Sequence, residues 1–209
     1  VEHTAMSERI EIRAAGPKPR LIENVVAVLV RGGLIAYPTD SGYALGWRTG
    51  NRKAHDRVIR LRELNRKDHF TYCCPTLSDV SRYAHVSNWA HRLIRQLTPG
   101  PYTFILPATS NVPKHHGQKR PSEIGIRIPD HEIVQAMLQT IDEPILSSSL
   151  ILPGMEDEIM DTEDLYDAVH QEVDLFVDAG YCPLEPTTLP DLTEDTPRVL
   201  RQGQGVVDF

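Results

Sequence analysis

Four short segments combine hydroxyl side chains with glycine or proline, and each borders an apolar run of the chain. They are residues 38–46 (PTDSGYALG), 99–103 (PGPYT), 147–149 (SSS) and 186–188 (PTT). Hydroxyls and free backbone N–H groups donate hydrogen bonds to anionic oxygens. Open α/β sheets bind ligands at the ends of their strands. We therefore expect the four segments to form the walls of one pocket for an anionic, phosphate-bearing ligand.

Segment 38–46 has two interpretations. It follows an apolar run and holds Thr39, Asp40, Ser41 and Tyr43 among glycines, which let a backbone approach a ligand closely. The other interpretation is a hairpin-like connection stabilised by Asx and Ser turns. The segment is not a P-loop, because the chain contains no G-x-x-x-x-G-K-[ST] pattern.

Arg60 and Arg62 are candidates for holding phosphate, because a guanidinium binds an oxyanion through two parallel hydrogen bonds. Residues two apart on a helix point in different directions, so both face one ligand only if the helix ends there. The alternative is a solvated helix face with ion pairs to Asp56 and Glu63.

Arg127 and the triple serine are candidates on strands. Arg127 alternates with two isoleucines and precedes a proline, so it faces either solvent or a polar pocket at a strand end. Burying a hydroxyl without a partner costs about 1–3 kcal/mol. Three serines in an apolar strand therefore favour a ligand, although pairing with nearby backbone is the other explanation.

Composition excludes several classes of site. The nine histidines and three cysteines include no C-x-x-C or H-E-x-x-H spacing, so the protein itself is expected to hold no metal. No G-x-S-x-G nucleophile motif occurs. The net charge is −7, but residues 48–67 carry eight basic and two acidic side chains, enough for a local basic face.

Hydrophobic periodicity, together with the positions of glycine, proline and capping residues, predicts intermixed helices and strands. Helices are expected at 19–31, after an N-cap at Asn51, and at 88–97, 131–140 and 163–171. Strands are expected at 34–37, 70–74, 102–106, 124–128, 145–150, 175–177, 188–192 and 199–201. Residues 115–122 are expected to form a polar loop. This order predicts an α/β fold, one domain with a twisted mixed β-sheet flanked by helices around a concave pocket.

The domain is expected to span residues 20–209, after an N-terminal extension at 1–19. Residues 1–5 precede Met6 and are taken as foreign to the domain. No apolar run approaches the roughly 20 residues of a membrane span, so no membrane partner and a cytoplasmic location are expected.

The motifs, in this order, resemble the YrdC/YciO family and its YciO branch. They are PTDSGYALG at 38–46, Arg60-Leu61-Arg62, PGPYTFIL at 99–106, IGIRIP at 124–129, SSSLILPG at 147–154 and PTTLPDLT at 186–193. Characterised members are threonylcarbamoyl-AMP synthases. The resemblance implies ATP as a substrate with Mg²⁺ bound to the nucleotide, L-threonine and bicarbonate as the other substrates, and a role in tRNA modification.

The resemblance also implies roles for individual residues. Nucleotide contacts are expected from Arg60, Arg62, Thr103, Ser149 and Arg198. Threonine contacts are expected from Thr39, Arg127, Ser147 and Thr187. No catalytic nucleophile is expected, since Arg60 and Arg62 would act by positioning and by charge.

Three departures from the family pattern keep two hypotheses open. Arg60 replaces the usual lysine, Ile151 replaces the asparagine that follows the serines, and a common pocket histidine is replaced near Cys73. One hypothesis is a nucleotidyltransferase of the synthase type. The other is a binding protein for double-stranded RNA or nucleotide, with weak or no synthase activity, acting in RNA or ribosome maturation.

Overall fold

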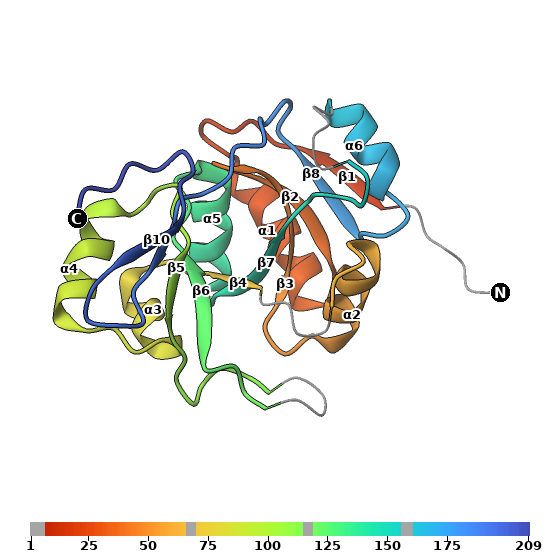
Figure 1. The fold of residues 1–209 in the computed structure, drawn as a ribbon. Helices are drawn as coiled ribbons and strands as arrows, with labels where there is room; N and C mark the ends of the chain where they lie inside the picture. Colours follow the sequence, from red (N-terminus) through yellow and green to blue (C-terminus); the bar gives the residue numbers. More distant parts are fainter. Residues whose placement is uncertain (1–6, 66–69, 115–118, 156–160) are drawn as a thin grey trace.

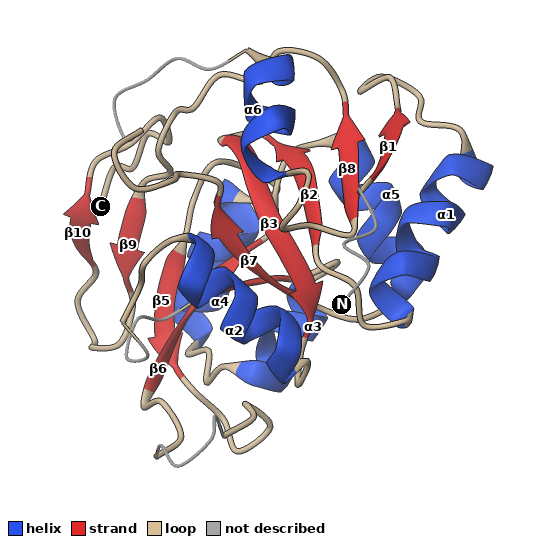
Figure 2. Cartoon of the chain, turned by 90° about the vertical axis from the view of Figure 1, so that its right-hand side faces the viewer, coloured by secondary structure: helices blue, strands red, loops and turns tan. Residues whose placement is uncertain are grey.

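A mixed β-sheet with helices on both faces organises the chain (Figures 1 and 2). The computed structural model describes residues 7–65, 70–114, 119–155 and 161–209. The strands in that part of the chain are β1 (Glu8–Glu11), β2 (Ile35–Thr39), β3 (Gly42–Arg48), β4 (Thr71–Cys73), β5 (Phe104–Pro107), β6 (Glu123–Arg127), β7 (Ile145–Ser149), β8 (Leu175–Asp178), β9 (Leu189–Asp191) and β10 (Arg198–Arg201). The helices are α1 (Pro19–Val30), α2 (Arg52–Leu61), α3 (Leu77–Tyr83), α4 (Asn88–Leu97), α5 (Glu132–Ile141) and α6 (Thr162–Val169).

The strand order is β1-β8-β2-β3-β7-β4-β6-β5-β9-β10. The pairs β1–β8, β2–β8, β4–β6 and β5–β9 are parallel, and the other neighbours are antiparallel. The predicted α/β class and mixed sheet are therefore confirmed. β1 falls within the predicted extension at 1–19, and it pairs with β8 as an edge strand.

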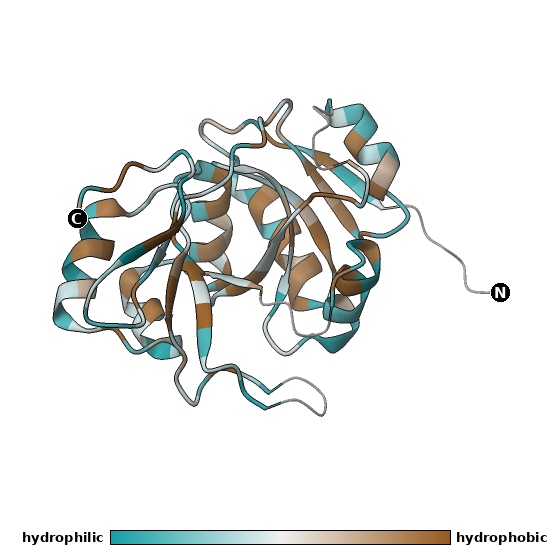
Figure 3. Cartoon of the chain, in the orientation of Figure 1, coloured by the Kyte–Doolittle hydropathy of each residue, from teal (hydrophilic) through white to brown (hydrophobic). Residues whose placement is uncertain are grey.

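Alternation along the buried strands builds a core on each face of the sheet. On β2, Ile35 and Tyr37 join a cluster with α1 and α5, whereas Ala36 faces a second cluster that includes residues of α2, α3, α4 and α6. In Figure 3, α1 and α5 carry both hydrophobic and hydrophilic residues, as expected for helices with one buried side. Both faces are therefore covered at the β2–β8 side of the sheet.

Helix boundaries follow local chemistry. Asn51 caps α2 as predicted, its Oδ1 accepting a hydrogen bond from the Ala54 N–H at 3.2 Å. α3 was not predicted, and its N-cap is Thr76. Of the predicted loop at 115–122, residues 115–118 lie outside the described part. No helix in the described ranges is long and apolar enough to cross a bilayer.

Segment 38–46 is a hairpin, which confirms the hairpin-like connection, and its part in ligand binding stays a prediction. β2 and β3 pair from Ile35↔Gly46 to Thr39↔Gly42, and only Asp40 and Ser41 form the turn. Gly42 has φ 109°, a conformation that suits glycine. β3 was hard to predict because Gly42–Trp47 is buried without interruption, which removes the polar alternation typical of a half-exposed strand.

Candidate functional site

A cavity of about 330 Å³ lies over the central strands of the sheet. Ser147, Thr71, Gly125 and Ile105 are successive register partners across β7, β4, β6 and β5, and all four line it. A Cβ on Gly125 would lie 3.2 Å from Thr103 Cγ2, so the missing side chain keeps this part of the floor open.

Six residues predicted for the site line this one cavity. They are Arg62, Thr103, Arg127, Ser147, Ser149 and Thr187. They come from the end of α2, from three strands or their approaches, and from the segment before β9. Three further predicted residues, Thr39, Arg60 and Arg198, are not among the described residues that line it.

The structure brings only one arginine of the Arg60–Arg62 pair to the cavity. Arg62 is the C-cap of α2 and is half-buried; it donates to Ser148 Oγ at 2.6 Å and to the Ile151 carbonyl at 3.1 Å. Arg60 is exposed on the last turn of α2. The helix continues through Leu61, so the two side chains diverge as the helix periodicity requires.

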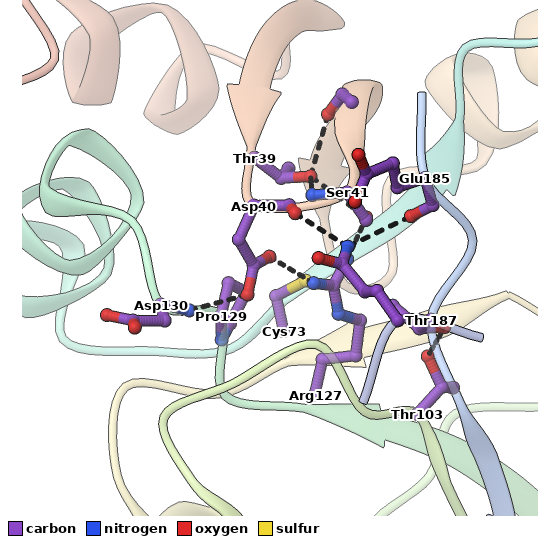
Figure 4. Close-up of polar contacts among 12 residues, drawn as sticks. Thr39, Asp40, Ser41, Cys73, Thr103, Arg127, Pro129, Asp130, Glu185 and Thr187 are labelled. Carbon is purple, nitrogen blue, oxygen red and sulfur yellow. Dashed lines mark hydrogen bonds and ion pairs between the residues drawn. The ribbon is translucent and has the colours of Figure 1, made fainter. Parts of the chain in front are cut away.

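Arg127 is held by the turn of the β2–β3 hairpin (Figure 4). It is 7 % exposed, donates to Ser41 Oγ at 2.9 Å and forms an ion pair with Asp40. The other Asp40 oxygen accepts the Asp130 N–H at 2.9 Å. Arg127 Nε is buried and has no hydrogen-bond partner among the described residues. The buried guanidinium is thus paired on one side and unsatisfied at Nε.

Thr39 closes the hairpin turn. It is 2 % exposed, donates to the Gly42 carbonyl at 2.7 Å and accepts the Ser41 N–H at 3.0 Å. Ser41, two residues along, lines the cavity instead. The sequence placed Ser41 in the candidate segment but assigned the ligand contact to Thr39, because only the turn geometry decides which hydroxyl faces inward.

The segment before β9 forms the opposite wall. Thr187 and Thr103 hydroxyls are 2.8 Å apart, and backbone hydrogen bonds join Thr103 to Thr188 and Thr188 to Pro101. Arg201 donates to the Thr187 carbonyl at 3.0 Å and to its Oγ1 at 3.1 Å, and it lines the cavity. Arg198 instead forms a 2.7 Å ion pair with Asp191. Arg201, which the sequence did not single out, therefore takes the cavity position expected of Arg198.

The lining is basic and rich in hydroxyls. Arg62, Arg127 and Arg201 are its charged side chains among the described residues, and no described carboxylate lines it. No group of three or more potential metal ligands occurs in the described ranges. Such a surface can bind and orient anionic oxygens.

A comparison with protein families decides the chain's relationship. The model of the Sua5/YciO/YrdC family, described as "Telomere recombination", matches residues 27–203. The chain belongs to this family. The *Escherichia coli* K12 protein YciO, itself uncharacterised, is 45% identical over 202 residues, 97% of this chain and 98% of that protein. The crystal structure of *E. coli* YciO has a TM-score of 0.89, covering 96% of this chain and 98% of that one.

More distant relatives of this family member carry an activity in their names. A threonylcarbamoyl-AMP synthase from *Hydrogenovibrio crunogenus* is 27% identical over 146 residues, 68% of this chain and 77% of that protein. The structure of *P. abyssi* Sua5 complexed with L-threonine has a TM-score of 0.84 at 22% identity, over 94% of this chain and 58% of that chain. At 22% identity, the similarity to P. abyssi Sua5 shows a shared fold and nothing more.

Proposed function

We propose that this family member binds ATP and L-threonine in the cavity and forms threonylcarbamoyl-AMP from them and bicarbonate. The observation that carries the proposal is the convergence of Arg62, Arg127 and four hydroxyl residues from distant parts of the chain on one space. Support also comes from the synthase name of the *Hydrogenovibrio* relative and from the L-threonine bound to *P. abyssi* Sua5.

The reaction needs positioning more than a protein nucleophile. The threonine amine adds to bicarbonate with loss of water and gives a carbamate. A carbamate oxygen then attacks the α-phosphorus of ATP, and the bond to the β-phosphate oxygen breaks to release pyrophosphate. Fixed hydrogen-bond donors aimed at the developing negative charge supply the main stabilisation in such transfers.

The proposed role of each residue follows from its position in or beside the cavity. Arg62 and Arg201 are the cavity cations proposed to hold the phosphates, with Thr103 and Ser149 beside them. Arg127, Ser147 and Thr187 are proposed for the threonine side, and Thr39 acts there by holding Ser41. Mg²⁺ is proposed to bind with the nucleotide, since it prefers phosphate oxygens and water.

The test is pyrophosphate release from ATP and bicarbonate, with and without L-threonine. Threonine-dependent release, together with threonylcarbamoyl-AMP detected by mass spectrometry, is the expected result. Arg62→Ala should weaken ATP binding by about tenfold or more, because it removes a charged donor to phosphate. Arg60→Ala is the matched control and should bind like the wild type, since Arg60 is exposed on the same helix. Equal losses in both variants, or no threonine dependence, would contradict the proposal.

A second candidate function is binding of nucleotide or structured RNA without synthesis. The observation that favours it is Ile151 on the cavity wall, an apolar side chain among the donors. Structured RNA, as tRNA or double-stranded RNA, is then the proposed partner. RNA binding that weakens steeply with salt, without pyrophosphate release, would support this function over the first.

A further inference from the structure

Three neighbouring strands bring a buried tyrosine into contact with Ser147, a residue of the cavity lining. Gly46 of β3 pairs with Ile35 of β2 on one side and with Ser147 of β7 on the other. A Cβ on Gly46 would lie 2.7 Å from Tyr37 Cε1, so the ring of Tyr37 occupies the space that a side chain would need. The Tyr37 ring thereby passes over β3, and its hydroxyl lies 2.6 Å from Ser147 Oγ.

The direction of this hydrogen bond follows from the available partners. Tyr37 is fully buried, and its hydroxyl contacts Ser147 Oγ and, at 3.7 Å, Cys73 Sγ. Burial raises the pKa of Tyr37 well above its usual value and raises the pKa of Cys73, so both groups keep their protons at neutral pH. Sulfur is a weak acceptor, so the available partners favour donation from the Tyr37 O–H to Ser147.

Ser147 then keeps its own proton for another acceptor. Its side chain lines the cavity, where an anionic oxygen is a far better acceptor than the competing Cys73 sulfur. A hydroxyl already accepting from Tyr37 is also a stronger donor, because linked hydrogen bonds polarise one another.

We propose that Tyr37 is a positioning residue that turns Ser147 into a dedicated donor toward the cavity. The ligand group opposite Ser147 is accordingly an anionic oxygen, of a carboxylate, carbamate or phosphate, and not an ammonium group. The inference rests on the proposed function only in its choice of L-threonine as the binding probe.

The first test uses the ligand-free protein. NMR in water should show a slowly exchanging hydroxyl proton that Tyr37→Phe removes and thereby assigns. Ser147→Ala should shift that proton strongly or abolish its protection. A Tyr37 hydroxyl proton unchanged by Ser147→Ala, or no protected hydroxyl in the wild type, would overturn the proposal whether or not the protein is a synthase.

The second test is a double-mutant cycle on L-threonine binding, measured by calorimetry on the full chain. Tyr37→Phe should weaken binding by about threefold to tenfold in the wild type and have no further effect in Ser147→Ala. Tyr72→Phe is the matched control, a buried tyrosine of the neighbouring strand β4 in the other core cluster, and should leave affinity unchanged. Equal losses from Tyr37→Phe in both backgrounds would mean a merely structural role and overturn the proposal. Wild-type protein that binds no L-threonine contradicts the proposed function, and the NMR result then decides the role of Tyr37.

Discussion

The cavity has two walls that are held in place differently. The hairpin wall, Thr39, Asp40, Ser41 and Arg127, consists of largely buried polar groups that hydrogen-bond to one another. The strap wall, residues 184–187 with Arg201, is exposed except at Thr187. The Thr103–Thr187 hydroxyl pair joins it to the segment before β5, and the Arg201–Thr187 hydrogen bonds hold its own two parts together.

This difference separates stability from binding. Breaking the buried network leaves charged or polar groups unpaired without water, so the hairpin wall should contribute mainly to folding stability. Exposed contacts are replaced by water at little cost, so changes on the strap wall should act mainly on ligand affinity.

The largest effect is expected from Asp40→Ala. It leaves the Arg127 guanidinium buried without its carboxylate, and such a loss costs about 3–5 kcal/mol of the free energy of unfolding. Urea denaturation measures it. Glu143→Ala, which breaks a partly exposed ion pair with Arg48, is the control and should cost about 1 kcal/mol or less. Similar costs for the two variants would remove the distinction between buried and exposed pairs.

A smaller loss is expected from Gly42→Ala, where the two walls meet. The residue has φ 109°, and a Cβ there would lie 3.0 Å from Leu184 Cδ1 and 3.1 Å from Leu184 Cα. Strain of this kind costs about 1–3 kcal/mol in thermal or urea unfolding. Gly50→Ala is the control, because Gly50 also has a positive φ, 81°, but no atom lies within 4 Å of the new Cβ. If Gly50→Ala costs as much, contact between the walls contributes nothing.

On the strap wall, Arg201→Ala should weaken ATP binding by about tenfold, the worth of one charge-assisted hydrogen bond to phosphate. Its unfolding free energy should change by about 0.5 kcal/mol or less, because the side chain is exposed. Calorimetric titration and urea unfolding measure the two quantities. Arg198→Ala, on the same strand but paired with Asp191, should keep wild-type affinity; the opposite ranking would return the nucleotide role to Arg198.

The smallest expected effect is a pH dependence beside the hairpin wall. Burial lowers the pKa of His131 below its ordinary value of 6.5, and this effect exceeds that of the negative charges of Asp40 and Glu132, which raise the pKa. The unfolded chain therefore binds a proton more readily, and this contribution to stability is present above about pH 6.5 and is lost as pH falls below it. Unfolding free energies at pH 7.5 and 5.5 should differ less in His131→Asn than in wild type. His91→Asn, at an exposed histidine on α4, should leave the difference unchanged.

Much of the fold could be predicted because its signals are local. The helix at 88–97 matches α4, and the predicted cap at Asn51 starts α2. The exceptions have physical causes: β1 is a four-residue edge strand, and β3 is buried on both sides and so lacks alternation. Thr39 and Gly42 stabilise its hairpin turn, so the glycine and one of the hydroxyls also have a structural role there.

Within the site, sequence alone selected residue types that the structure gathers. Hydroxyls and arginines at strand ends predicted one anion-binding cavity, and six of the nine chosen residues line it. Residue spacing also indicated that the side chains of Arg60 and Arg62 point in different directions on a helix.

Only the tertiary structure decided which donors face the cavity. The hairpin turn decides that Ser41 lines the cavity and Thr39 does not. The register of β10 selects Arg201 over Arg198. The end of α2 selects Arg62 over Arg60. Local propensity is set by neighbours in sequence, but the pairing of Asp40 with Arg127 or of Tyr37 with Ser147 joins residues 87 and 110 positions apart. Such contacts exist only once the strands have assembled in register.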